Sequence, residues 1–192
     1  MKKMMIFAMV ILAATMANAQ GVKFHDLKFT EACELAKKEN KRVFVDFTMR
    51  GCGPCAQMKQ AVFPKKVLGD FYNKEFISIT LNISYDKKAL ALAQELGATG
   101  YPFYAWYDAD EEPLHFMSGA RSVDIMLENA KTAITEDACI VLWDKYDEGD
   151  TSKEVLTKFY KYLKAYKARE VEMIKEVEDK IISLYGEEAI VI

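Results

Sequence analysis

Short β-rich runs, separated by amphipathic segments, constrain the fold of this chain more than any other feature of its sequence. Residues 43–47 form a continuous apolar run with one acid inside it, which is typical of a buried central strand. Residues 76–83 are β-rich and partly alternating, and they predict a second central strand. Residues 103–107 and 113–117 flank a polar turn and predict a hairpin.

Helical patterns lie before, between and after these runs. We expect helices over residues 30–40, 55–68, 86–96 and 121–134, with Thr30 as the N-cap of the first. In the second helix we expect Pro64 to introduce a kink. Strands separated by helices are joined by parallel crossovers, whereas a hairpin is antiparallel. The order therefore predicts an α/β fold with a central mixed sheet and helices on both of its faces.

The C-terminal part of the chain differs in character. We expect a helical extension over residues 136–192, following a domain over residues 20–135. Thr151 and Glu154 have the spacing of a capping box. Residues 151–185 form either one long helix or a hairpin broken near Ala168, because neither Gly nor Pro separates the two halves. The polar face of this extension is either simply solvated or a docking element for a partner.

The first 19 residues have the pattern of a secretory signal peptide. Lys2 and Lys3 precede an apolar run over residues 4–15, and small residues at Ala17 and Ala19 predict cleavage after Ala19. The alternative is a membrane anchor, but the run is shorter than the roughly 20 apolar residues that a span needs. We therefore expect an exported, periplasmic protein whose mature form is not stably inserted in a membrane.

Charge and histidine content exclude several classes of function. Removing residues 1–19 takes away two lysines and no acid, so the net charge moves from −3 to about −5. This acidic balance argues against nucleic acid as a partner. Only His25 and His115 are available for chemistry that depends on histidine.

Cys52-Gly53-Pro54-Cys55 is the motif that carries chemistry. Residues three apart lie on one face of a helix, about 5–6 Å apart, and a small relaxation at a helix start lets two cysteines form a disulfide. Pro54 suits the first turn, where a missing N–H costs nothing, and Gly53 leaves room for a bulky partner. The spacing predicts a dithiol that opens and closes without rearranging the fold.

The two cysteines have different expected roles. Cys52 lies at the positive end of the helix, which stabilises a thiolate. Lowering a thiol pKa from about 8.5 to about 7 raises the thiolate fraction at neutral pH from roughly 3% to roughly 50%. Cys52 is therefore the expected attacking sulfur, and Cys55, one turn further in, the resolving sulfur. Because the reaction resides in the two sulfurs, we expect neither a cofactor nor a metal.

Asp46 is the one charge inside the run 43–47. A buried carboxyl group prefers to be neutral, and one close to the cysteines would exchange a proton with Cys55 as the disulfide forms and breaks. The alternative is an acid at a strand edge that reaches solvent.

These motifs together resemble the thioredoxin family. The resemblance rests on Val45-Asp46-Phe47, Cys52-Gly53-Pro54-Cys55, Leu81-Asn82-Ile83 and Gly100-Tyr101-Pro102, in the order and spacing of that family. It covers residues 24–134 and is similar in particular to the C-terminal domains of membrane thiol-disulfide transducers. It implies a thioredoxin fold, with Pro102 in the cis form facing the disulfide. It also implies that the backbone of Tyr101 holds the substrate like an added strand.

The sequence departs from the family at three positions. Gly51 replaces the Trp that usually precedes the first cysteine, Thr80 replaces a Lys beside the buried acid, and Phe103 replaces a Thr after the cis-proline. These departures concern the substrate surface and the proton path through Asp46. They leave the two-cysteine chemistry untouched.

Two other functions compete with an oxidoreductase. A zinc site needs two more ligands than Cys52 and Cys55 supply, and the sequence shows no second pair. A thioredoxin-fold binding or chaperone module, with the helical tail as its docking element, is the main alternative, because a fold does not guarantee a chemistry.

The Gly-Pro dipeptide favours reduction or isomerisation of disulfides in exported proteins, because it resembles thioredoxins. Their potential near about −270 mV suits reduction, whereas strong oxidants lie near about −120 mV. A reductase outside the cytoplasm needs an electron source, which implies a membrane donor as a partner.

Two further cysteines, Cys33 and Cys139, are isolated in apolar surroundings. We expect buried thiols, and the alternative is a disulfide that joins them and ties the tail to the core.

Overall fold

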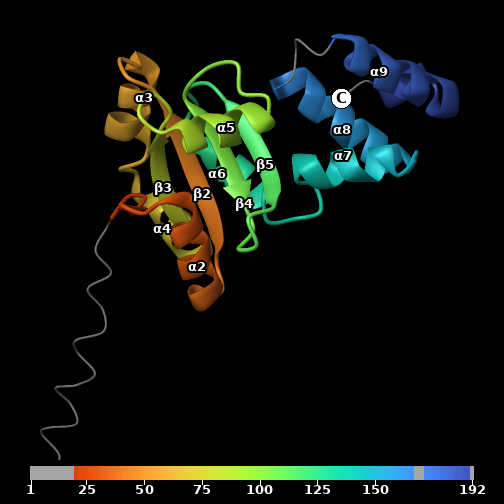
Figure 1. Ribbon diagram of the computed structural model, residues 1–192. Coiled ribbons are helices and arrows are strands. Elements are labelled where there is room, and N and C mark those ends of the chain that lie inside the picture. Colours follow the sequence, from red (N-terminus) through yellow and green to blue (C-terminus); the bar gives the residue numbers. More distant parts are fainter. Residues whose placement is uncertain (1–19, 167–170, 191–192) are drawn as a thin grey trace, which may run out of the picture.

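A computed structural model describes residues 20–166 and 171–190 of the chain, and a five-stranded mixed sheet forms its centre (Figure 1). The strands lie in the order β1-β3-β2-β4-β5. β1 and β2 run parallel to β3, while β4 is antiparallel to β2 and β5 is antiparallel to β4. The bounds are Phe24–His25 for β1, Arg42–Thr48 for β2, Phe76–Asn82 for β3, Phe103–Tyr107 for β4 and Pro113–Ser118 for β5. The predicted mixed sheet is confirmed, and only the two-residue β1 was not predicted.

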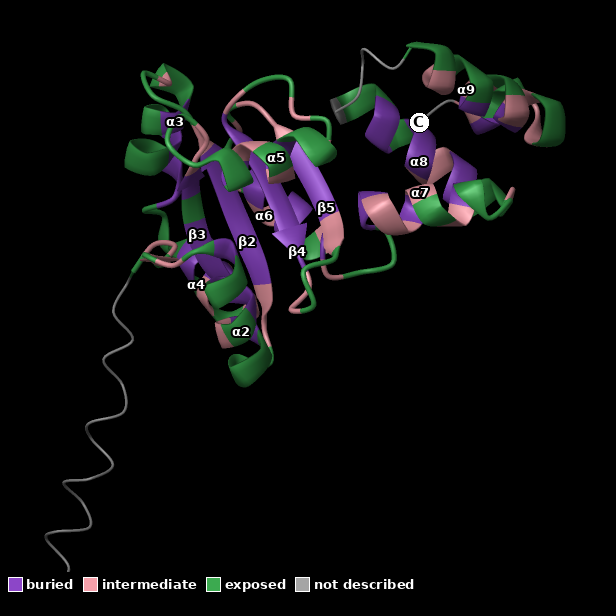
Figure 2. Cartoon of the chain, viewed as in Figure 1, coloured by how far each residue is buried: buried purple, intermediate pink, exposed green. Residues whose placement is uncertain are grey.

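Helices cover both faces of this sheet, as predicted. One hydrophobic cluster joins α2 and α5 to one face, and a second joins residues 58–63, α4 and α6 to the other. The helices are α2 Phe29–Glu39, α3 Gly53–Gln57, α4 Lys66–Glu75, α5 Lys87–Glu95 and α6 Val123–Thr132. Figure 2 shows the strands buried between these layers and the outer faces of the helices exposed.

The alternation of side chains along β2 explains how both faces are filled. Val43, Val45 and Phe47 point into the cluster under α2, while Phe44 lies in the cluster under α4. Because successive side chains of a strand point to opposite faces, Asp46 lies on the same face as Phe44. That face is covered by residues 58–63, which directly follow α3 and the two cysteines at its start.

The prediction of one helix over residues 55–68 was wrong. α3 continues into a π-helical segment, η1 (Met58–Val62), and a separate helix, α4, follows after Pro64. The wide turn is closed by the bond from the Phe63 N–H to the Met58 carbonyl, 3.0 Å long. It adds a residue to the turn, so that Met58, Val62 and Phe63 all reach the core. Pro64, which has no N–H, ends this segment instead of kinking a continuous helix.

The start of α2 also differs from its prediction. Lys28, not Thr30, is the N-cap, because the Glu31 carboxylate reaches back and accepts a bond of 2.9 Å from the Lys28 N–H. The helix ends at Asn40 as expected, in the left-handed conformation with φ 52°.

Where the structure describes the C-terminal extension, its helices are α7 Cys139–Asp147, α8 Lys153–Tyr166 and α9 Val171–Tyr185, followed by the 3-10 turn η2 Glu187–Ala189. The Tyr185 hydroxyl, at the end of α9, donates to the Thr151 carbonyl before α8, at 2.7 Å. The two helices therefore form an antiparallel hairpin, and the break predicted near Ala168 lies outside the described residues. α8 is capped by Ser152, whose carbonyl accepts its first helical bond, and not by Thr151.

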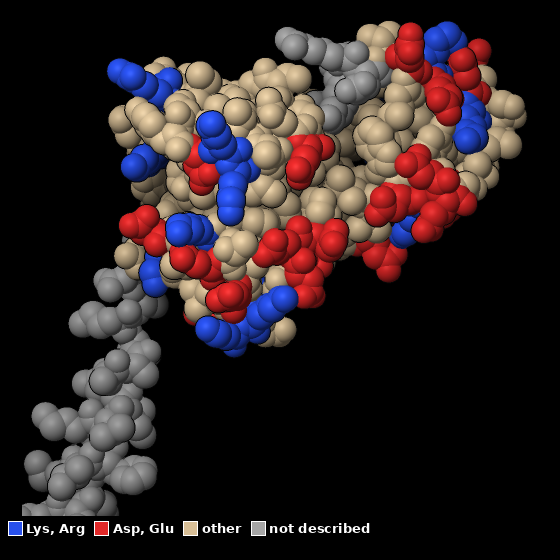
Figure 3. All heavy atoms as spheres, in the orientation of Figure 1, with Lys and Arg blue, Asp and Glu red and all other residues tan. Residues whose placement is uncertain are grey.

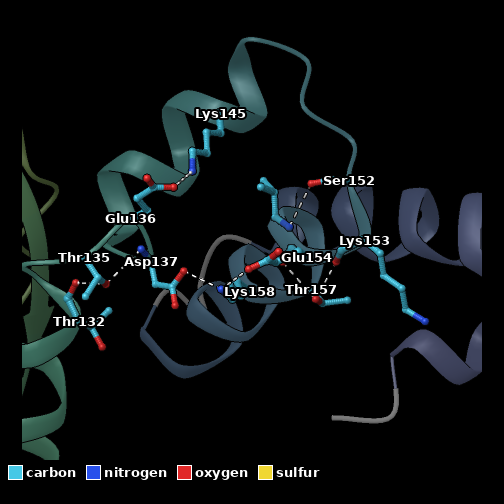
Figure 4. A network of polar contacts seen from close by, with 11 residues as sticks. Thr132, Thr135, Glu136, Asp137, Lys145, Ser152, Lys153, Glu154, Thr157 and Lys158 are labelled. Carbon is cyan, nitrogen blue, oxygen red and sulfur yellow. Dashed lines mark hydrogen bonds and ion pairs between the residues drawn. The ribbon is translucent and has the colours of Figure 1, made fainter.

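A network of polar contacts joins the loop before α7 to α8 (Figure 4). Lys158 of α8 lies 2.7 Å from both Asp137 and Glu154, and Lys145 pairs with Glu136 at 3.0 Å. Exposed pairs of this kind contribute little each, typically about 0.2–1 kcal/mol. Figure 3 shows acidic side chains gathered over the tail helices on the face in view.

The tail packs against β5, which is an edge strand of the sheet. Phe116 pairs with Ala105 of β4 on one side, and the tail contacts its backbone groups on the other. Its N–H donates to the Cys139 Sγ at 3.4 Å, and its carbonyl accepts from the Tyr162 hydroxyl at 3.2 Å. An edge strand with open backbone groups invites pairing with another chain, so this cover protects β5.

Candidate redox site

A disulfide joins Cys52 and Cys55 at the start of α3, with their Cα atoms 5.3 Å apart. Cys52 is the N-cap, and its Sγ accepts a bond of 3.1 Å from the Cys55 N–H. Cys55 is 7% exposed, whereas Cys52 is partly exposed. The predicted difference in access between the two sulfurs is therefore present.

The loop that carries Cys52 follows directly from β2, and hydrogen bonds join it to the residues that follow β3. Gly51 has φ 73°, a left-handed conformation that glycine adopts without strain. The Arg50 N–H donates to the Ser84 hydroxyl at 3.0 Å, and the Ile83 N–H donates to the Thr48 carbonyl at 2.9 Å. These bonds join the ends of the parallel strands β2 and β3, so the cysteine loop is anchored in the sheet.

Gly53 and Pro54 occupy the first turn of α3. Both are exposed, and a Cβ built on Gly53 would meet no atom within 4 Å. The surface beside Cys52 is therefore open at Gly53, which agrees with the room for a bulky partner expected there.

Asp46 is buried, with an exposed fraction of 5%. It lies opposite Thr80 on β3 and Tyr104 on β4. Within the described residues its Oδ1 atom has no hydrogen-bond partner. Burial raises the pKa of Asp46 to about 7, and the charge of Lys59 and a hydrogen bond from Thr80 oppose this rise. A carboxyl group with this pKa exchanges protons near neutral pH.

A cleft of about 620 Å³ brings these groups together. Of the predicted site residues, Asp46, Cys52, Gly53 and Cys55 line it. The described residues that line it are Phe24, Asp46, Thr48, Met49, Gly51, Cys52, Gly53, Cys55, Ala56, Lys59, Phe63, Thr80 and Asn82. Asp46 thus lines the same cleft as the cysteines, and it is buried and not an acid that reaches solvent at a strand edge.

The Tyr101–Pro102 peptide bond is cis, as the family resemblance implied. Phe103, the first residue of β4, pairs with Phe47 near the end of β2, so the cis bond lies at the same end of the sheet as the loop to Cys52. The Pro102 carbonyl accepts from the Gly119 N–H at 2.8 Å. Among the described residues that line the cleft, neither Tyr101 nor Pro102 is included.

Lys59 is a site residue that the sequence analysis missed. It stands four residues after Cys55, one helical turn on, and it lines the cleft with Asp46. The spacing from Cys55 is a signal that was available in the sequence. The approach to Asp46 was not, because it depends on how α3 and η1 lie over β2.

Cys33 and Cys139 are both buried, and the structure holds both as thiols, as predicted. Burial raises the pKa of Cys33 to about 12, so it is not a reactive thiolate near neutral pH. The part of the chain that the structure describes contains no group of three or more metal-ligating side chains.

None of the helices described within residues 20–166 and 171–190 combines the length and apolar character that a membrane span requires. The predicted signal peptide, residues 1–19, lies outside these ranges.

Comparisons with known proteins agree with this geometry. The model of the thioredoxin-like domain family matches residues 29–134, more than half of the chain. A solved structure of a candidate disulphide isomerase from Bacteroides thetaiotaomicron is 27% identical, with a TM-score of 0.55, and the match covers 62% of this chain and 97% of that one. Comparison with curated proteins found no match.

Two more distant structures share the fold. A DsbH oxidoreductase is 17% identical with a TM-score of 0.50, over 62% of this chain and 90% of that one. A thioredoxin from Thermus thermophilus is 18% identical with a TM-score of 0.51, over 60% and 89%. The chain belongs to the thioredoxin-like family, and the disulfide at the start of α3 supports its assignment as a thiol-disulfide oxidoreductase.

Proposed function

We propose that this protein reduces or isomerises disulfides of exported proteins by dithiol-disulfide exchange through Cys52 and Cys55. The observation that carries the proposal is the disulfide at a helix N-terminus, with one sulfur accessible and the other buried. This arrangement lets the accessible Cys52 sulfur attack a bulky substrate, while the buried Cys55 sulfur lies close enough to Cys52 to attack the resulting mixed disulfide.

Cys52 performs the first step. In the reduced protein its thiolate is stabilised by the helix end and by the Cys55 N–H, which already points at the sulfur. The thiolate attacks one sulfur of the substrate disulfide. A bond forms between Cys52 and that sulfur, the substrate S–S bond breaks, and the second substrate sulfur leaves as a thiolate and takes a proton from solvent.

Cys55 performs the second step. Asp46 takes the proton of the Cys55 thiol, and the resulting thiolate attacks the Cys52 sulfur of the mixed disulfide. The Cys52–Cys55 bond forms, the mixed disulfide breaks, and the substrate thiolate leaves and is protonated. Two electrons pass from the dithiol to the substrate. Because the pKa of Asp46 is raised to about 7, this carboxyl group is suited to the transfer.

The substrate backbone is proposed to lie along the open surface formed by Gly53 and Pro54 and to pair with the backbone of Tyr101 before the cis Pro102. In support, the cis bond and the cysteine loop lie at the same end of the sheet.

We further propose that the protein works in the periplasm after cleavage behind Ala19, and that a membrane dithiol donor returns it to the reduced state. The signal pattern of residues 1–19 and the need of an exported reductase for electrons support this proposal.

The test uses the mature protein, its Cys52→Ser variant and its Cys55→Ser variant. With dithiothreitol as donor, the mature protein should accelerate insulin reduction and Cys52→Ser should not. Cys55→Ser should accumulate mixed disulfides with exported proteins, because the resolving sulfur is missing. Equal insulin reduction by mature protein and Cys52→Ser would identify a binding or chaperone module instead.

The direction of electron flow is tested by titration against glutathione. A potential near about −270 mV supports reduction, and one near about −120 mV would contradict it.

A further inference from the structure

Lys59 lines the cleft of the redox site, although no hydrogen bond joins it to either cysteine within the described residues. It follows Cys55 by four residues, and side chains at this spacing lie on one face of a helix. The same cleft is lined by Lys59, Asp46 and both cysteines. Lys59 is exposed, as is usual for a lysine, whose methylene stem can lie along a surface while its ammonium group reaches water.

Asp46 has otherwise neutral polar surroundings. Thr80 faces it from β3, Tyr104 from β4 and Tyr72 from α4. Arg121 acts on the hydroxyl of Tyr104. Among the residues that the structure describes, Lys59 is the charged side chain that acts on the carboxyl group itself. Thr80 stands where the thioredoxin resemblance placed a lysine, so β3 brings no cation to Asp46.

The charge of Lys59 is available for this role. No acidic side chain in the described part of the chain forms an ion pair with it, whereas Lys66, on the next helix, is paired with Asp70 at 2.6 Å. Because the cleft is lined by one buried carboxyl group and by no surface acid in the described residues, no neighbouring acid offsets the charge of Lys59 there. That charge therefore acts on the Asp46 carboxyl group.

We propose that Lys59 is a positioning residue of the redox site, one whose ammonium group stabilises the charged form of Asp46 so that Asp46 takes the proton of Cys55 near neutral pH. This inference rests on the proposed function. In the resolving step the proton moves from the Cys55 Sγ to the Asp46 carboxylate, and one negative charge moves from the carboxylate to the sulfur. The cleft holds one negative charge before and after the transfer, and Lys59 faces it in both states.

The test measures the resolving step directly with Ellman's disulfide as the probe. Reduced Cys52 takes up one thionitrobenzoate and releases another, and attack by Cys55 on the mixed disulfide then releases the second in a second step. The rate of this second step is followed against pH. Lys59→Gln should raise its apparent pKa by about 0.5–1 unit and slow it about three- to tenfold below neutral pH, because an opposite charge nearby favours a carboxylate. Lys59→Arg should restore the profile, and Lys66→Gln should leave it unchanged.

A double variant separates action through Asp46 from action on the sulfurs. In an Asp46→Asn background, Lys59→Gln should cause no further shift of the pH profile. An equal shift in both backgrounds would mean that Lys59 acts on the thiolates directly, and an unchanged profile in Lys59→Gln would also overturn the inference. Release of one thionitrobenzoate per molecule instead of two by the unaltered protein would count against the proposed function itself.

Discussion

Replacing Asp46 by asparagine removes the one acid that the sheet buries beside the disulfide. The two side chains have nearly the same shape, so the cavity around β2 stays filled. The perturbation is therefore mainly electrostatic. In the folded protein the pKa of Asp46 is raised from 3.8 to about 7, because burial disfavours the charged form.

The magnitude follows from the difference between these two values. A difference of about 3 units corresponds to about 4 kcal/mol, and relaxation of the surroundings reduces this to about 2–4 kcal/mol. Above neutral pH the carboxyl group is charged in both states, and the native state bears the full cost. As pH falls from about 7 to about 4, the native state takes up its proton before the unfolded state does, and the cost disappears.

The assay is urea unfolding of the oxidised protein and of Asp46→Asn, repeated between about pH 3.5 and pH 8. At pH 8 the variant should be more stable by about 2–4 kcal/mol, and this gain should shrink by up to about 1.4 kcal/mol per pH unit on acidification. Groups common to both proteins cancel in the difference. A gain that stays constant across this range would refute the account of a buried, proton-exchanging carboxyl group.

Three further predictions concern the tail and the N-terminal segment formed by Gln20 and Gly21, which lies against α4. His115 is buried and accepts a hydrogen bond of 3.0 Å from the Cys139 N–H, and burial lowers its pKa to about 4. Because the unfolded state takes up a proton first, the free energy of unfolding should fall by up to about 3 kcal/mol between pH 6.5 and pH 4. Urea unfolding of Asp46→Asn shows this loss without the opposite effect of the carboxyl group, and its persistence in a His115→Gln version would contradict the assignment. Tyr162→Phe removes the hydroxyl bonded to the Phe116 carbonyl and should cost about 1 kcal/mol by the same measurement, with no change arguing that the tail does not cover the strand edge. Gly69→Ala would place a Cβ against the backbone of Gln20 and Gly21, so it should lower the free energy of unfolding by about 1–3 kcal/mol and speed amide exchange in that segment. Unchanged exchange would show that the segment does not pack on α4.

Much of the candidate site is local in sequence and was therefore predictable. The order of strands and helices predicted the mixed sheet, because each element can be recognised from its own hydrophobic periodicity. The spacing of Cys52 and Cys55 predicted a helix-start disulfide, because both residues lie within one turn. The burial of Asp46 followed from its place inside an apolar run.

The errors fall where packing overrides local pattern. The segment after Cys55 was expected to continue as one helix, but a π-helical turn forms because Met58, Val62 and Phe63 must all reach the core. The N-cap of α2 shifted to Lys28, since Glu31 satisfies the backbone there.

The sequence by itself determined which chemistry this chain carries and which segments form strands, because both depend on residues within one turn or one run. Only the tertiary structure decided which side chains meet across elements. It brings Lys59 to Asp46, and it seats the tail on β5 through Cys139 and Tyr162. Such contacts join residues on separate elements, and the packing of those elements is a property of the whole core, which no single window of sequence contains.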